Sequence, residues 1–235
     1  MIVSLALSAV LALPGAPAHA WHSWAPDGVK AFSNTVLVRN NVFTSHGTQE
    51  IWADSRNRFG VYTKQPAGNT AVLSYPDRQD LEYIPIHRLR ALRANYKVNM
   101  PSRGDYETAF DIWVQPNGDP NDWDHNIEVM IWVNNHGQVP AGRPMDHAVT
   151  EYDQRFTIWR DGPKNQGDSI FSLVLNDPRK HGTMHILSVF RWLIAHGYFP
   201  ASSGLNDVEF GWEICSTGGA WENFRARYSL HRELS

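Results

Sequence analysis

The chain has 235 residues, of which 42% are hydrophobic and 19% charged, and its formal net charge is −3. This composition is ordinary for a globular protein and argues against disorder, while the length suits one large domain or at most two small ones. Because basic residues are not in excess, the chain lacks the positive field on which nucleic-acid binding depends. We therefore expect no nucleic-acid partner.

The N-terminal segment is typical of a secretory signal peptide. Residues 2–13 form an apolar run, and residues 18–20 read Ala-His-Ala, the small-x-small pattern that precedes a cleavage site. The run is too short to span a membrane, and it lacks the usual basic residues at its start. We expect residues 1–20 to be removed, leaving a secreted, monomeric protein without a membrane segment and with one domain over residues 21–235.

Short runs with the alternation of β-strands follow, separated by turns rich in Gly, Pro, Asn and Asp. Strands are expected at residues 35–43, 49–53, 59–63, 71–75, 106–114, 126–133, 154–159, 169–175, 208–216 and 223–230. Connections are expected at residues 76–85, 116–124 and 136–147. Residues 89–100 fit either one helical turn or an irregular strand.

One segment, residues 184–196, has helical spacing of its apolar residues, and Gly197 follows as a stop signal. Many short strands with a single helix predict an all-β fold, an antiparallel sandwich of two sheets with one helix packed on it. Cys215 is the only cysteine, so no intramolecular disulfide can form.

The strand at residues 126–133 has two different faces. Four branched apolar residues alternate along one face, and Glu128 shares the other face with Met130 and Trp132. A carboxylate is seldom tolerated beside such residues without a partner or a task. This strand therefore indicates a binding cleft, with Met130 and Trp132 as candidate substrate contacts.

Two more strands repeat this division. Residues 106–114 place Asp111 and Glu107 opposite an apolar face, and residues 208–215 place Glu213 and Glu209 in the same way. If the apolar faces share one core, then the acids share the opposite surface. Glycoside hydrolysis needs two such carboxyl groups, one to attack or to activate water and one held protonated as the acid. Acids on solvated sheet faces are common, however, and alternation alone leaves both interpretations open.

The sequence around these acids resembles glycoside hydrolase family 12, the small endoglucanases of cellulase type. Residues 110–113 read Phe-Asp-Ile-Trp, residues 128–132 read Glu-Val-Met-Ile-Trp and residues 210–213 read Phe-Gly-Trp-Glu. The order of these three sequence motifs matches the family, and the resemblance extends over roughly residues 36–230. It implies a β-jelly roll with an open cleft and retaining hydrolysis of internal β-1,4-glucosidic bonds in cellulose, mixed-linkage glucan or xyloglucan, without cofactor or metal.

Carried over to this chain, the resemblance implies that Glu128 is the nucleophile, Glu213 the acid/base and Asp111 the acid that hydrogen-bonds the nucleophile. A retaining enzyme holds its two carboxyl groups about 5–5.5 Å apart. Glu107 and Glu209 are the acids most easily confused with the catalytic pair.

One departure concerns binding. The family usually has Asn-Asn-x-Trp-Gly where residues 40–44 here read Asn-Asn-Val-Phe-Thr. We expect Asn41 and Phe43 to contact substrate, with Phe43 giving a smaller stacking surface than Trp and no N–H donor. Trp52 is a candidate to compensate for that loss.

Two other classes of function remain open. The chain could be a carbohydrate-binding jelly roll without catalysis, because one fold hosts recognition as readily as chemistry, or a glycosidase of another β-1,4 polymer such as xylan. His181 and His185 have a helix-like spacing that suits a metal, but no third ligand is evident, and a solvated helix start is the better interpretation. No catalytic sequence motif containing His accompanies Cys215, so a thiol nucleophile is not supported.

Overall fold

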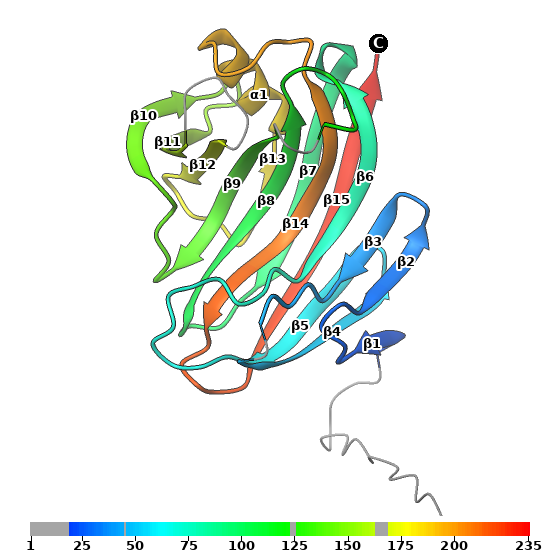
Figure 1. The fold of residues 1–235 in the computed structure, drawn as a ribbon, viewed down its shortest axis with the longest axis vertical. Helices are drawn as coiled ribbons and strands as arrows, with labels where there is room; N and C mark the ends of the chain where they lie inside the picture. Colours follow the sequence, from blue (N-terminus) through cyan, green and yellow to red (C-terminus); the bar gives the residue numbers. More distant parts are fainter. Residues whose placement is uncertain (1–18, 45, 123–125, 163–168) are drawn as a thin grey trace, which may run out of the picture.

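The computed structural model describes residues 19–44, 46–122, 126–162 and 169–235. Within these residues the chain forms two stacked β-sheets with one α-helix at one end (Figure 1). The N-terminal residues 1–18 of the expected signal segment lie outside the described part. None of the helices in the described ranges is long and apolar enough to cross a membrane.

The smaller sheet has six strands. Their order is β1 (Trp21–Ser23), β4 (Thr48–Ser55), β5 (Arg58–Lys64), β15 (Glu222–Leu234), β7 (Leu89–Asn99) and β13 (His181–Met184). All of these neighbours pair antiparallel.

The larger sheet has nine strands. Their order is β10 (Arg143–Val149), β11 (Arg155–Asp161), β12 (Ser169–Leu175), β9 (Ile127–His136), β8 (Asp105–Gln115), β14 (Gly204–Ser216), β6 (Asp77–Pro85), β3 (Val36–Arg39) and β2 (Val29–Ser33). The expected sandwich of antiparallel sheets is confirmed, with one parallel pair, β9 and β12. These two strands run parallel because β10 and β11 lie between them in the chain and return β12 to the free side of β9.

The core lies between the two sheets and confirms the predicted faces of the central strands. The branched apolar residues of β9, the even-numbered apolar residues of β14 and Phe110 on β8 all belong to one buried cluster. Phe110 and Phe210 meet there with ring centroids 4.7 Å apart, and Phe210 stacks on Tyr228 of the opposite sheet at 5.0 Å. The acid-bearing faces of β8, β9 and β14 therefore point away from the core.

The helix, α1, spans Ile186–Ala195, and Gly197 with φ 74° follows its end. The expected helix at 184–196 is confirmed, although its first residue belongs to β13. One turn of 3₁₀ helix, η1 (Ile86–Arg88), precedes β7, so that residues 89–99 are a strand.

The prediction of a connection at residues 76–85 is wrong, because β6 occupies nearly all of it. Its inner face carries Arg78 and Asp80, which form a buried ion pair at 2.7 Å, and the Arg78 guanidinium lies 4.7 Å from the Tyr228 ring centroid. Because the inward-facing residues of β6 include a buried ion pair, this strand lacks the apolar alternation from which strands were predicted. Two smaller predictions also fail: residues 143–147 belong to β10, and residues 71–75 form only an isolated bridge at Ser74.

Candidate active site

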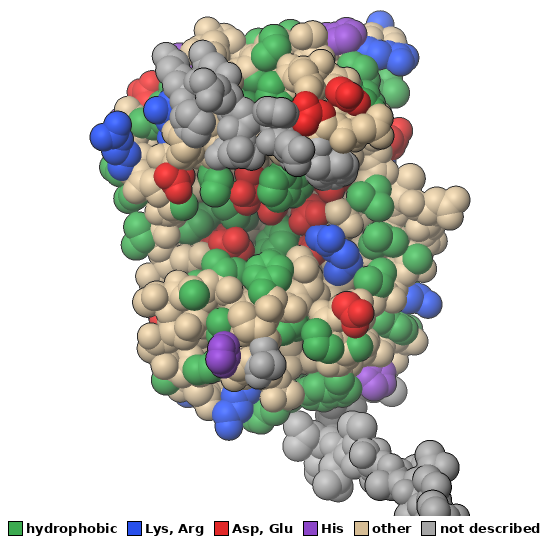
Figure 2. Space-filling model, viewed as in Figure 1, with side chains coloured by type: hydrophobic (Ala, Val, Ile, Leu, Met, Phe, Trp, Pro, Cys, Tyr) green, Lys and Arg blue, Asp and Glu red, His purple; other side chains and the backbone are tan. Residues whose placement is uncertain are grey.

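The three candidate acids lie on adjacent strands of the nine-stranded sheet, in the order β9, β8, β14. The register places Glu128 opposite Trp113, Asp111 between Met130 and Glu209, and Glu213 opposite Glu107. Figure 2 shows acidic side chains gathered in a hollow of this surface, bordered by hydrophobic ones. The structure therefore brings the predicted acids onto one hollowed face.

Glu128 and Glu213 line the same cavity of about 510 Å³. The side chains that complete it include those of Met130, Trp132, Gln138, Val139, Ile170 and Cys215. Carboxyl groups from two strands that are separated by β8 thus line one cavity. Such convergence of polar groups in a mostly apolar hollow is typical of a ligand site.

Met130 and Trp132 are on the predicted face, but they are covered more than a flat stacking platform would be. They are 4% and 2% exposed and pack with Ala109, with Ile170 and Val174 of β12 against them. Their remaining surface contributes to the cavity wall. This apolar cluster lowers the local polarity beside Glu128.

Burial and mutual repulsion raise the pKa values of these acids. Desolvation, followed by the charge of Glu213, raises the pKa of Glu128 to about 7, whereas a hydrogen bond with Asp111 opposes that rise. Burial next to Glu128 raises the pKa of Asp111 well above its usual value. Burial also raises the pKa of Glu213. Near neutral pH the group therefore retains protons that isolated carboxyl groups would have lost.

Two residues hold Glu213 in place. Gln138, in the loop after β9, donates from Nε2 to Glu213 Oε2 at 3.0 Å. Glu107 is fully buried, and its Oε1 accepts the Glu213 backbone N–H at 3.2 Å. Glu107 therefore supports the strand beneath Glu213 and is closed to substrate. Sequence reasoning missed Gln138, because nothing in a polar loop distinguishes one glutamine as a partner of an acid.

A second group of buried acids continues the same face across β14, β6 and β3. Arg39 donates from Nη2 to Asp77 at 2.9 Å and to Glu209 at 2.8 Å. Gln79 Nε2 donates to Glu209 at 2.7 Å and to Asp207 at 2.8 Å. Glu209 is thereby engaged in an ion-pair network, which removes it as an alternative to Glu213.

Two of the expected binding residues, Asn41 and Phe43, are not among the residues that line the cavity. Phe43 is 54% exposed but does not line it, and Asn41 (φ 44°) is hydrogen-bonded through its side chain to Asp77. Trp52 does not compensate for Phe43, because β4 belongs to the six-stranded sheet. Periodicity gave the face of each residue but not the sheet to which its strand belongs.

The remaining candidates have other surroundings. Burial and the charge of Glu213 raise the pKa of the Cys215 thiol to about 12, which removes the thiolate a nucleophile would need. His181 lies on β13, and His185 stacks on Tyr152 with centroids 3.5 Å apart. The described ranges contain no group of three or more His, Cys, Asp or Glu residues arranged to hold a metal ion.

The buried acids make folding stability depend on pH. Burial raises the pKa values of Asp77 and Asp207 to about 6. Burial and the charge of Glu213 raise the pKa of Glu128 to about 7. The folded chain holds these protons more tightly than the unfolded chain does. The protonated carboxyl groups therefore stabilise the folded state fully below about pH 4, and this stabilisation is lost as the pH rises through about 6–7. Taken as independent, these three pKa shifts predict a loss of about 5 kcal/mol in the free energy of unfolding between about pH 5 and pH 8, seen as a fall of about 10–20 °C in Tm.

Thermal unfolding followed by circular dichroism at constant ionic strength measures this change. A Tm that stays constant or rises from pH 5 to pH 8 would contradict these raised pKa values.

A β-sandwich with paired carboxyl groups in a surface hollow is an arrangement typical of enzymes that cleave glycosidic bonds. The sequence profile of glycosyl hydrolase family 12 matches residues 20–228. The chain belongs to this family and is a glycosidase.

Solved structures agree with this fold. The xyloglucanase domain of a type three effector from Sinorhizobium fredii, solved with cellobiose, is 22% identical with a TM-score of 0.75 over 92% of this chain and 100% of that one. A family 12 xyloglucanase from Bacillus licheniformis is 18% identical with a TM-score of 0.77 over 91% and 100%. Endoglucanase 3 from Trichoderma harzianum is 18% identical with a TM-score of 0.78 over 92% and 100%. A comparison with curated protein sequences gave no significant match.

Proposed function

We propose that this protein is a secreted, endo-acting glycosidase that cleaves internal β-1,4-glucosidic bonds of cellulose-like polysaccharides with retention of configuration. The observation that carries the proposal is that Glu128 and Glu213 line one cavity on a family 12 fold. The effect of the Glu213 charge on the Glu128 pKa supports their proximity. Retention predicts a separation of about 5–5.5 Å between the two carboxyl groups.

Glu128 is proposed as the nucleophile. Its hydrogen bond with Asp111 favours the ionised form, because the burial that raises the Asp111 pKa keeps that carboxyl protonated and able to donate. Asp111 thus directs one oxygen of Glu128 and leaves the other to attack the anomeric carbon. Glu128 then forms the covalent glycosyl-enzyme intermediate of a double displacement.

Glu213 is proposed as the acid/base. Burial favours its protonated form, and the Gln138 amide orients one of its oxygens. In the first step Glu213 gives its proton to the leaving glycosidic oxygen. In the second step the resulting carboxylate takes a proton from the water that hydrolyses the intermediate.

The candidate substrates are proposed from the similar structures and from the residue at position 43. Two of the similar structures are described as xyloglucanases and one as an endoglucanase. The side chain at position 43 is an exposed Phe, a smaller stacking surface than the Trp usual in the family. We expect activity on β-1,4-linked glucans, with cellulose, mixed-linkage glucan and xyloglucan as the candidate substrates.

Reducing-sugar release from cellulose, mixed-linkage glucan, xyloglucan and xylan tests this proposal. We expect cleavage of at least one of the three glucans, with a rapid fall in viscosity because the cuts are internal. Cleavage of xylan alone would identify a glycosidase of another β-1,4 polymer. Binding without cleavage of any of them would identify a carbohydrate-binding protein.

A further inference from the structure

Trp52 lies on the outer face of the six-stranded sheet, away from both the core and the cavity. Its neighbours Ile51 and Ala53 point into the core, which directs Trp52 outward. The indole lies across Gly60 of β5, where an added Cβ atom would come within 2.5 Å of the ring. Its buried N–H has no hydrogen-bond partner. An outward aromatic ring with an unused donor is a feature that the cleft chemistry does not explain.

A histidine from the N-terminal segment covers this ring. The His19 imidazole stacks on Trp52 with centroids 3.9 Å apart and planes 7° apart, and its Nδ1 lies 2.9 Å from Asp54 Oδ1. This cover helps to explain why Trp52 is only 2% exposed on an outer face. His19 belongs to the segment that we expect to be removed, and its loss would uncover the indole.

A row of cationic side chains crosses the sheet beside Trp52. The register aligns Arg58, Arg227, Lys97 and His181 on β5, β15, β7 and β13, and Arg225 lies next along β15. Among the ion pairs of the described residues, only Arg58 of this row has an acidic partner, Asp54 at 3.3 Å. Like charges directly opposite one another destabilise a sheet. An anionic partner would offset that cost.

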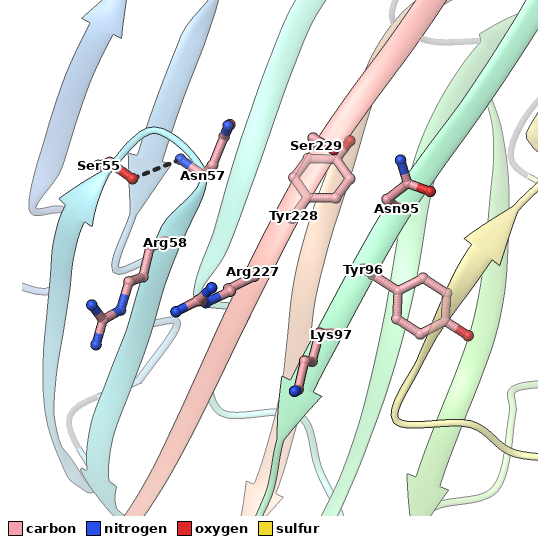
Figure 3. Close-up of a pocket in the computed structure, with 9 residues that line it drawn as sticks. All are labelled: Ser55, Asn57, Arg58, Asn95, Tyr96, Lys97, Arg227, Tyr228 and Ser229. Atoms are coloured by element: carbon pink, nitrogen blue, oxygen red, sulfur yellow. Dashed lines mark hydrogen bonds between the residues drawn. The ribbon is translucent and has the colours of Figure 1, made fainter.

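The row borders two adjoining hollows. The larger, of about 440 Å³, is drawn in Figure 3, where Arg58, Arg227 and Lys97 come from three neighbouring strands. The smaller, of about 160 Å³, shares these three residues and reaches Trp52 and Arg225. The aromatic ring and the cationic row therefore border one continuous surface.

Further aromatic rings extend this surface along β5. Tyr62, the next outward residue after Gly60, stacks on Trp221 with centroids 4.6 Å apart. Trp24 meets Trp221 edge-on at 6.2 Å, and both tryptophans are 38% exposed. Flat rings beside cationic groups match a ligand that has both ring faces and carboxylates.

We propose that this face is a second glycan-binding surface, separate from the cleft, that binds a polysaccharide bearing carboxylate groups. The guanidinium groups of Arg58 and Arg227 and the ammonium group of Lys97 bind uronic acid carboxylates. Trp52 stacks on a sugar ring once His19 has left it. The surface holds the enzyme on an acidic polymer while the cleft remains free for its substrate, and it uses neither Glu128 nor Glu213.

A glycan fits this face better than a lipid surface does. On the strands of this sheet, Leu234 is the only aliphatic side chain among the exposed large hydrophobic residues that the structure describes. A membrane-binding face needs a larger apolar area to insert. The larger hollow is lined instead by polar groups such as Asn95 and Ser229, which suit hydroxyl groups.

Retardation of the full chain in native gels containing polygalacturonate, at low ionic strength, tests the proposal. We expect Arg225→Gln with Arg227→Gln to weaken binding about tenfold. His19→Ala is expected to strengthen it several-fold by uncovering Trp52, and adding Trp52→Ala should cancel that gain. Circular dichroism establishes that each variant is folded, and cleavage of the soluble β-glucan is expected to stay at the level of the unchanged chain.

The matched control is Arg155→Gln with Arg191→Gln, which removes the same charge from exposed arginines on β11 and α1, away from this surface. An equal loss of binding in this control would show a general charge effect and overturn the proposal. So would an absence of retardation by polygalacturonate. Equal binding to dextran sulfate or to phosphatidylserine vesicles, with no dependence on His19 or Trp52, would also overturn it.

Discussion

Glu128→Gln is expected to reduce the turnover of β-glucan by about a thousandfold or more, while the fold and the binding of glucan persist. A thousandfold loss corresponds to about 4 kcal/mol of transition-state stabilisation. The amide keeps the shape of the side chain and its place beside Asp111, but it cannot form the glycosyl ester. It also removes the charge that stabilises the oxocarbenium-like transition state. The expected result is therefore a loss in kcat with little change in KM.

The matched control is Glu233→Gln, the same change at an exposed position on β15 of the other sheet. Initial rates on a soluble β-glucan measure the effect, and thermal unfolding shows whether the variants are folded. A Glu128→Gln enzyme that retained a tenth or more of its activity would remove Glu128 from the role of nucleophile.

A second variant tests the geometry of attack. Glu128→Ala leaves space for azide on the face of the sugar that Glu128 would have occupied. With an activated aryl β-cellobioside, attack of azide from that side gives the α-glycosyl azide, in which the anomeric configuration is inverted. Formation of the β-anomer instead would place the missing carboxylate on the other face and contradict the assignment.

The parts of the fold that alternation predicted are those whose inner face is apolar. On β8, β9 and β14 every second residue enters the core, so the acid-bearing face follows directly. Alternation failed for β6 because Arg78 and Asp80 point inward and pair with each other, and hydrophobicity does not report a satisfied ion pair. It failed for β10 because nearly all of its side chains are exposed, so the strand depends on pairing with β11.

The active site shows the same limit. Periodicity placed Glu128 and Glu213 on the outer faces of their strands, but only the strand order and register bring both to one cavity. The partners that distinguish equivalent acids are remote in sequence: Arg39 engages Glu209, and Gln138 engages Glu213. Net charge does not predict where charged residues cluster either: this chain has an excess of acidic residues, yet it carries a row of cationic side chains on its six-stranded sheet.

Glu213→Ala is expected to separate the two steps of the reaction according to the leaving group. On β-glucan, whose leaving alkoxide needs a proton, we expect a loss of about 10²–10⁴-fold, the usual contribution of general acid catalysis. On an aryl β-cellobioside with a very acidic phenol, the first step should be nearly unchanged, because that leaving group departs without protonation. The second step should be slow with both substrates, since the base that activates water is missing.

Pre-steady-state measurements of phenol release give the required readout. A rapid burst followed by slow turnover is expected, because the glycosyl-enzyme accumulates when only its hydrolysis is impaired. Azide, which needs no base, should accelerate that turnover and give a β-glycosyl azide, the anomer opposite to the one expected from Glu128→Ala.

Gln138→Ala separates a role in positioning from one in chemistry. The Gln138 amide donates to only one oxygen of Glu213, so we expect Gln138→Ala to lose less activity than Glu213→Ala. The alkaline limb of the pH–rate profile should also shift, because this hydrogen bond lowers the pKa of Glu213. Without this hydrogen bond Glu213 should stay protonated to higher pH, and the alkaline limb of the profile should move to higher pH.

If Glu213→Ala slowed the first step equally for all leaving groups, Glu213 would be excluded as the acid. Another carboxyl group of this face would then have that role.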